Sequence, residues 1–595
     1  MHQFDYICRN NSLTTMLRDL IKEGGLYTIA NLLTKGIGLL LIPFYTAYFT
    51  TADYGMIDIL AVFGGIVSTL ISLQLNQGMS RFIADGETED AQKRKIASTT
   101  IIIITFIYLG FGVFITFYPE LFVDILSNPD TKVPIELIQY AIYATILSGI
   151  LYLLGVYLRA LRRVKEFTFL SFGFALINTL LMIYLILNLG LGIKGIYLST
   201  IIISPVFILI TLYLLRKEIM FFVGKKEFLL IFKFSVPLIP AALSYLLMNT
   251  IDRIYIKDML SFDEAGIYGI AFKFSSIITI IITGFTMAMN PIVFENHQKK
   301  ESKKEIERIF QYFFVFGTIG LIVLSLFSYE TLFIFTNSTF YPAAIIMPVM
   351  YLSVLVTGLA MFSPGINIAG KTTIGAIVII LTSALNLVLN YSFIIWFGLI
   401  GAAISTLICV SIFYVVYFII STKHYPIFLN FKKLIPILSL NLGLIVLGAY
   451  FINFSFWINF TLKILLIIIY CTVIYFTHLK TGIIKIKNRV LFRQQLKAFR
   501  KIASGQKERF SMLDSDLYRC MNDNTQNTGF DRHYVYHTSW AARYLKEKGT
   551  EKHIDISSTL FFSGIVSAFL DIDFYDYRPA DLVLSGLNSK KGDLN

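Results

Sequence analysis

Six of the ionisable residues inside the long apolar stretches of this 595-residue chain are candidates for function, because no water is expected to solvate them there. A charged side chain at membrane depth costs about 2.5 to 3.5 kcal/mol on insertion scales, so it usually faces a cavity or a partner and serves a function. The six are Lys35, Asp58, Asp252, Arg253, Lys257 and Lys273.

The cations and the carboxylates of this group predict different chemistry. Lys35, Arg253 and Lys273 are candidate substrate-binding residues, because ammonium and guanidinium groups suit phosphate oxygens. Asp58 and Asp252 are candidates for ion coupling or for pairing with a cation. In the simpler alternative these charges only pair with one another or snorkel to the membrane surface. A cavity for drug cations would instead need a carboxylate lining.

The elements that must position these residues are transmembrane helices. Hydrophobic residues make up 56% of the chain and charged residues only 15%, which excludes a soluble domain. A helix needs about 20 apolar residues to cross the bilayer, and we expect fourteen such spans in an all-α polytopic protein. They lie near 26–49, 56–79, 97–118, 138–159, 167–189, 193–215, 232–256, 266–288, 309–328, 342–362, 373–395, 398–421, 433–453 and 456–477.

Lys and Arg alternate between the loops in a way that sets the orientation. Even-numbered loops are rich in them, as at Lys93–Lys95, Arg159–Lys165 and Lys299–Lys304, and odd-numbered loops hold few. Because cytoplasmic loops retain positive charge, both termini are predicted to be cytoplasmic. Residues 1–23 are then a cytoplasmic N-terminus, and the first span is the insertion signal. The net charge of +13 reports this topology, and no nucleic-acid partner is predicted.

An internal repeat divides the spans into two halves. Gly192-Ile-Lys-Gly195 and Gly398-Leu-Ile-Gly401 match at a distance of 206 residues, and Gly55 matches Gly266 at a distance of 211. Six crossings return a chain to its starting side, so the halves are parallel repeats. The alternative is that such glycine patterns are simply common in membrane helices. The predicted parts are a six-helix lobe at 24–229, a second at 230–425, and two additional helices at 426–478.

The start of the second half carries a family resemblance. Phe234-Ser-Val-Pro237-Leu-Ile-Pro240, followed by Asn249-Thr-Ile-Asp252-Arg253, resembles the polysaccharide (Wzx-type) flippases of the MOP transporter superfamily. The resemblance implies two lobes around a central cavity that opens alternately to either side. It also implies a substrate, an oligosaccharide on a polyprenyl pyrophosphate, which is moved from the inner to the outer leaflet. Pro237, Pro240 and Pro291 are candidate helix bends.

The polar tail has two parts. Residues 479–529 form a basic juxtamembrane segment, read either as an amphipathic helix on the inner leaflet or as a stop-transfer flank. Residues 530–595 resemble the opening βαβ unit of a class I S-adenosylmethionine-dependent methyltransferase, with Asp555 and Asp576 at the strand ends. Ser557-Ser558 stand where that family has glycine, so we expect a truncated fragment without methyl transfer.

The function expected from these observations is transport without covalent chemistry. The leading hypothesis is a flippase for lipid-linked oligosaccharide in the cytoplasmic membrane of a bacterium, serving polysaccharide, O-antigen or capsule biosynthesis. The alternatives are a cation-coupled multidrug exporter of the same superfamily and, ranked lower, an O-antigen polymerase or ligase. No catalytic residue, metal site or cofactor is predicted. The expected partners are membrane lipids, the lipid-linked substrate and polysaccharide assembly proteins.

Overall fold

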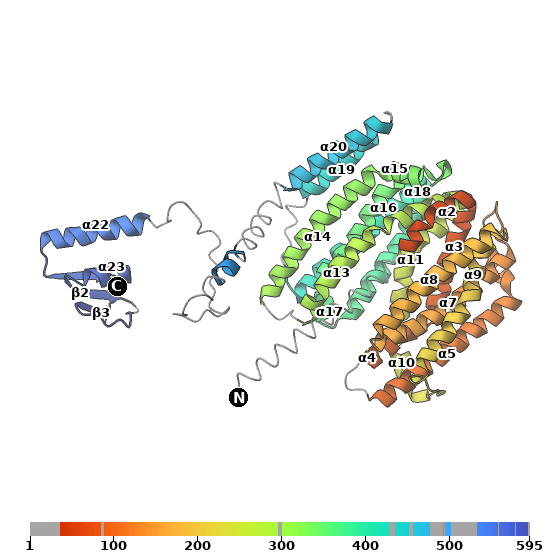
Figure 1. Ribbon diagram of the computed structural model, residues 1–595, viewed down its shortest axis with the longest axis horizontal. Helices are drawn as coiled ribbons and strands as arrows, with labels where there is room; N and C mark the ends of the chain where they lie inside the picture. The colour runs from red at the N-terminus through yellow and green to blue at the C-terminus, as the bar shows by residue number, and fades with distance from the viewer. Residues whose placement is uncertain are drawn as a thin grey trace. The chain divides into compact units, whose positions relative to one another are not determined.

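A computed structural model describes most of the chain (Figure 1). The described residues are 36–84, 89–295, 300–427, 435–450, 456–475, 492, 494–500, 532–556, 558–577 and 579–592. The chain divides into two compact units, Met1–His478 and Leu479–Asn595, and each is described by itself. The basic segment predicted at 479–529 lies largely outside the described residues.

The first half of the membrane unit consists of helices that pack mainly on one another. Its apolar core is built largely from α3, α5 and α7, with α8 and α9 packed against α7. The elements are α2 (Ile42–Tyr48), α3 (Thr51–Ile71), α4 (Leu75–Ala84), α5 (Asp90–Phe117), η1 (Pro119–Phe122), α6 (Val123–Leu126), α7 (Ile135–Ala160), α8 (Val164–Leu187) and α9 (Gly192–Leu215).

The second half repeats this arrangement, and two further helices follow it. Its elements are α10 (Lys225–Ser235), η2 (Val236–Leu238), α11 (Ile239–Met259), α12 (Phe262–Ser275), α13 (Ile278–Glu295), α14 (Lys300–Leu326), α15 (Ser328–Phe335), η3 (Ser338–Phe340), α16 (Ala343–Gly358), η4 (Leu359–Phe362), α17 (Gly365–Ile368) and α18 (Thr372–His424). The additional pair is α19 (Ile435–Tyr450) and α20 (Phe456–Ile474), which both pack on α14.

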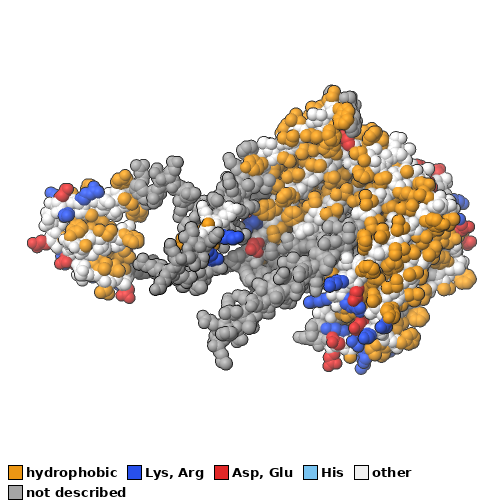
Figure 2. Space-filling model, in the orientation of Figure 1, with side chains coloured by type: hydrophobic (Ala, Val, Ile, Leu, Met, Phe, Trp, Pro, Cys, Tyr) orange, Lys and Arg blue, Asp and Glu red, His pale blue; other side chains and the backbone are white. Residues whose placement is uncertain are grey.

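The helices confirm an all-α, multi-pass membrane protein. Within the described residues, eleven helices are long and apolar enough to cross a membrane, and two shorter apolar helices occur at Gly36–Tyr48 and Pro436–Leu447. The 53-residue α18 holds two of the predicted spans, separated by a kink at Gly398. Every predicted span therefore coincides with at least part of a helix. Figure 2 shows apolar side chains over the membrane unit and Lys and Arg gathered where α4, α5 and α10 lie.

The glycines of the internal repeat have the same structural role in both halves. Gly192 and Gly398 both have left-handed backbones, with φ of 52° and 58°, which L side chains adopt only under strain. A Cβ atom on Gly195 would lie 3.0 Å from Ile186, and one on Gly401 would lie 2.0 Å from the carbonyl oxygen of Phe393. Each glycine thus lets a helix begin directly against the end of the preceding one.

Several spans are broken where the sequence predicts continuous helices. The predicted span at 56–79 is two helices, because Leu73 and Gln74 adopt left-handed backbones between α3 and α4. The seventh span contains the 3-10 turn η2, with Pro237 inside it and Pro240 in the first turn of α11. Pro291, in contrast, lies within the unbroken α13. The helix bend predicted at Pro291 stays a prediction.

The second unit is a small α/β piece. It contains α22 (Arg532–Lys548), β1 (Lys552–Ile556), α23 (Leu560–Val566), β2 (Asp571–Asp576) and β3 (Leu587–Lys591). The strands form a parallel sheet in the order β1-β2-β3, of which β3 is an element that the sequence did not predict. Asp555 is buried and accepts hydrogen bonds from the hydroxyls of Ser558 and Ser563.

A buried carboxylate makes this sheet sensitive to acid. Asp573 contacts the ammonium groups of Lys552 and Lys590 at 2.8 Å and 2.9 Å, and these two hydrogen bonds lower its pKa from 3.8 to about 2. Because the folded pKa lies below the unfolded one, this stabilisation is complete above about pH 4 and is lost as the pH falls towards 2.

We therefore expect Asp573→Asn to destabilise the unit at pH 6 but not at pH 2. The measurement is urea unfolding followed by the fluorescence of Trp540 in the full chain, with Trp396 and Trp457 replaced by Phe. If the free energies of unfolding of the parent and of Asp573→Asn differed by the same amount at pH 6 and at pH 2, the ion-pair explanation would be wrong.

Candidate functional site

The two halves of the membrane unit meet where α3 crosses α12. A Cβ atom on Gly55 would lie 2.0 Å from the carbonyl oxygen of Phe262, and one on Gly266 would lie 2.0 Å from that of Thr51. The two contacts are related by the 211-residue repeat, so each half presents the same surface to the other. Thr51 also donates a hydrogen bond from its hydroxyl to Asp263 across this contact. We call this glycine crossing the seam; the charge pattern predicts that it lies on the outer side of the membrane.

Because the helices touch at Gly55, we expect Gly55→Ala to push α3 and α12 apart at the seam. The added methyl group has no room, and overpacking costs about 1 to 3 kcal/mol, which shifts an open-to-closed equilibrium by roughly 5- to 150-fold. The measurement is the rate at which an impermeant maleimide labels a Thr51→Cys reporter, a position only 9% exposed in the parent. Gly65→Ala is the control, because its methyl group would make an ordinary 3.7 Å contact with Leu246. Equal labelling rates in the two variants would refute the prediction.

Next to the seam, an ion pair joins the halves through the membrane interior. Arg253 of α11 places its Nε atom 3.0 Å from Oδ2 of Asp58 of α3. The guanidinium also lies over the ring of Phe272, with 4.1 Å between its central carbon and the ring centroid. Arg253 is 4% exposed, and its Nη2 atom has no hydrogen-bond partner among the described residues. A buried guanidinium with a spare donor is suited to bind an anion.

Lys273 is the second cation at the interface between the halves. It projects from α12, and its Nζ atom lies 5.2 Å from the ring centroid of Tyr45 in α2, the helix that belongs to the first span. In the part of the chain that the structure describes, no carboxylate lies within ion-pair distance of it. The structure thus places Lys273 and Arg253 on neighbouring helices that both contact α3. Lys35 lies outside the described residues.

A third cation, Lys257, hydrogen-bonds the outer end of α11 to the first half. Lys257 is 1% exposed and donates to the carbonyl oxygens of Ser127 at 2.7 Å and Ile125 at 3.2 Å, and it also pairs with Asp258. The carbonyls belong to the connection between α5 and α7 in the other half. Snorkelling of Arg253 and Lys257 to the surface is therefore wrong, because both are buried. The other part of the simpler alternative, that the charges pair with one another, holds for Arg253 and Asp58.

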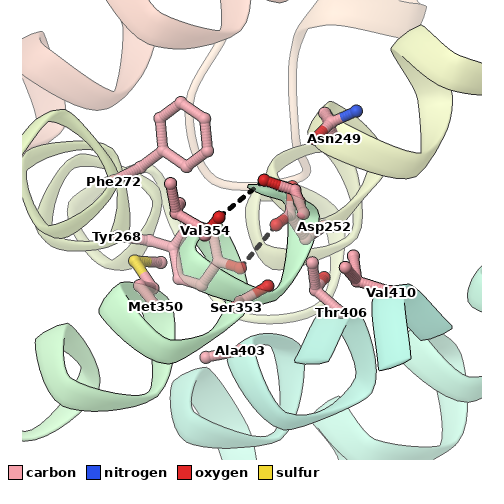
Figure 3. Close-up of a pocket in the computed structure, with 11 residues that line it drawn as sticks. Asn249, Asp252, Tyr268, Phe272, Met350, Ser353, Val354, Ala403, Thr406 and Val410 are labelled. Carbon is pink, nitrogen blue, oxygen red and sulfur yellow. Dashed lines mark hydrogen bonds between the residues drawn. The ribbon is translucent and has the colours of Figure 1, made fainter. Parts of the chain in front are cut away.

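Asp252 points into a small cavity of the second half whose other walls are mainly apolar (Figure 3). Its carboxylate accepts hydrogen bonds from the hydroxyl of Tyr268 and from the backbone N–H of Arg253. Figure 3 shows Ser353 and Thr406 turned towards the same space. The cavity has a volume of about 30 Å³, enough for a water molecule or a small cation. Among the described residues, Asp252 therefore does not pair with a lysine.

The sequence did not indicate the aromatic residues of this site. Tyr45, Phe272 and Tyr268 contact Lys273, Arg253 and Asp252 respectively. Aromatic residues are 15% of this chain, so an individual ring carries no signal above that background. The sequence indicated this site only through the buried charged residues that these rings contact.

Two family models match the sequence. The model described as "polysaccharide biosynthesis protein" matches residues 20–297, and the model described as "MatE" matches residues 237–392. The two matches meet in the region of α11 to α13, which carries Arg253 and Lys273. A comparison with curated proteins gives no significant match.

Solved structures of transporters share the fold at low sequence identity. The lipid II flippase MurJ in an inward closed conformation has a TM-score of 0.59 and 18% identity, covering 76% of this chain and 98% of its own. An inward-facing multidrug resistance MATE family transporter of the MOP superfamily has a TM-score of 0.53 and 15% identity, with 65% and 94% coverage. A mutant of the Vibrio cholerae MATE transporter VcmN has a TM-score of 0.51 and 17% sequence identity, and the match covers 69% of this chain and 98% of that one.

The fold and the two-half site define the class of this protein. It is a multi-pass membrane protein with the fold of a transporter. More narrowly, this is the fold shared by transporters of the MOP superfamily, and the matched family models are those of polysaccharide biosynthesis and MatE proteins.

Proposed function

We propose that this protein is a flippase that moves a polyprenyl-pyrophosphate-linked oligosaccharide from the inner to the outer leaflet, for the assembly of a surface polysaccharide such as O-antigen or capsule. The observation that carries the proposal is the pair of cations between the halves: among the described residues, Nη2 of Arg253 has no hydrogen-bond partner, and Lys273 has no carboxylate within ion-pair distance. The ammonium of Lys273 and the free donor of Arg253 suit the oxygens of a pyrophosphate. The matched description, polysaccharide biosynthesis, supports the same substrate class.

Separation of the Arg253–Asp58 ion pair is the step that would start transport. A phosphate that reaches Arg253 competes with Asp58, and once that pair separates, the contact of α3 with α11 loses this salt bridge. The seam is then held by the packing of the glycine crossing, by the Thr51–Asp263 hydrogen bond and by the hydrogen bonds of Lys257. Substrate binding therefore favours opening towards the outer side, as alternating access requires. Both halves contribute residues, because the cation and its carboxylate come from different halves.

We assign Asp252 to the coupling cation or proton. Its cavity has room for one small ion, and the hydroxyl residues Ser353 and Thr406 line it together with the carboxylate. Asp58 is less suited, since Arg253 already neutralises it. Asp252 is the neighbour of Arg253 in α11, so occupancy of the cavity is expected to act on the ion pair through this helix.

The experiment is transport by the purified protein in liposomes. A fluorescent polyprenyl-pyrophosphate oligosaccharide should be flipped, and its flipping should exceed that in empty liposomes at least tenfold. A cationic dye, tested in the same liposomes, should not move. Dye transport without oligosaccharide flipping would establish the multidrug exporter instead.

A further inference from the structure

The first half contains a second cavity, distant from the seam. It measures about 500 Å³ and is enclosed by α7, α8, α9 and the helical residues just before α2. One end lies at Arg159, at the end of α7 that is predicted to be cytoplasmic, and Ser148 and Asn178 mark the other end. Ligand cavities in proteins typically measure about 300 to 1,000 Å³, so this space is large enough for a bound molecule.

The interior of this cavity is suited to a hydrocarbon chain. Leu151, Leu170 and Phe174 line it, and two of its hydroxyls are already occupied within their own helices. Ser148 donates to the carbonyl oxygen of Thr145 at 3.1 Å, and Thr211 donates to that of Phe207 at 2.7 Å. Ser171, Asn178 and Thr179 also line the cavity, but apolar surface makes up the larger part of its walls.

The mouth of the cavity is positively charged. Arg159 is exposed and lies over the rings of Phe167 and Tyr152, with its guanidinium carbon 5.0 Å and 5.6 Å from their centroids. Within the described residues no carboxylate pairs with it. Arg163, in contrast, is neutralised by Glu166.

The depth of the cavity matches one leaflet. Ser148 and Arg159 are separated by eleven residues of α7, or about 16 Å along the helix axis, which is half of the roughly 30 Å hydrocarbon core. We propose that this cavity binds one anionic phospholipid of the inner leaflet, with an acyl chain between α7, α8 and α9 and its phosphate on Arg159. Basic pockets between transmembrane helices on the cytoplasmic side are a known setting for anionic headgroups.

Native mass spectrometry of the full chain tests this proposal, with phosphatidylglycerol, phosphatidylethanolamine or polyprenyl phosphate as the added lipid. We expect one phosphatidylglycerol per protein, bound at least tenfold more tightly than phosphatidylethanolamine. Arg159→Gln should weaken phosphatidylglycerol about ten- to a hundredfold, the value of a charge-assisted phosphate contact. Ala175→Phe, which fills the cavity, should prevent binding of both phospholipids.

Lys165→Gln is the matched control, because it removes a neighbouring cation that does not line the cavity; it should bind phosphatidylglycerol like the parent. Equal binding by Arg159→Gln and the parent would overturn the role of Arg159, and unchanged binding by Ala175→Phe would overturn the location. Preferential binding of polyprenyl phosphate would overturn the identity of the lipid. Size-exclusion profiles establish that each variant is folded.

Discussion

Replacing Lys273 by glutamate is expected to abolish transport, while Lys273→Arg retains it and Lys273→Ala weakens it. The order follows from charge: Lys273 lies between the halves without a carboxylate partner among the described residues, so its ammonium is available to the substrate's pyrophosphate. A charge-assisted bond to phosphate is worth roughly 1.5 to 3 kcal/mol. The alanine variant should therefore bind substrate about ten- to a hundredfold more weakly.

The assay is complementation of surface polysaccharide in a deletion strain, with protein abundance measured by blot. Lys194→Ala is the matched control, because Lys194 is an exposed lysine that already pairs with Glu136. Lys35 is expected to follow the same order as Lys273. Full complementation by Lys273→Ala at low expression would show that this lysine does not bind the pyrophosphate, and the proposed site would then rest on Arg253 alone.

The sequence predicted the membrane helices well because each is a local property. About 20 apolar residues bounded by charge predict a span whatever the span packs against. The repeat was also readable, since the glycines at 192 and 398 are required by left-handed backbones. The break at Leu73 and Gln74 was not predicted, because neither glycine nor proline marks it.

The partners of the buried charges could not be predicted in the same way. Asp58 and Arg253 are 195 residues apart, and their contact depends on how α3 packs against α11. The sequence indicated that each charge needs a partner, but not which one. It also contained an indication that was missed: Lys463 lies in the middle of the last predicted span, where a charge needs a partner as much as Lys273 does.

The partner of Lys463 is Glu330, and the pair attaches the additional helices to the second half. Nζ of Lys463 in α20 lies 2.7 Å and 2.9 Å from the two carboxylate oxygens of Glu330 in α15. Asn459 donates to the same carboxylate at 3.0 Å. Lys463 is 1% exposed and Glu330 is 4% exposed. Both charges are therefore shielded from water and from lipid headgroups, and each depends on the other.

Lys463→Met is consequently expected to lower the free energy of unfolding by about 3 to 5 kcal/mol, because it leaves the Glu330 carboxylate buried without a counter-charge. The double variant Glu330→Gln, Lys463→Met should recover most of this loss, since both uncompensated charges are then gone and a glutamine still accepts from Asn459. The measurement is reversible denaturation of the purified protein in mixed micelles. Lys194→Met provides the control: it breaks an ion pair whose side chains are 43% and 62% exposed, and exposed pairs contribute only about 0 to 1 kcal/mol. If Lys463→Met proved as stable as Lys194→Met, or if the double variant were no more stable than the single one, the buried pair would not be what attaches α20 to the second half.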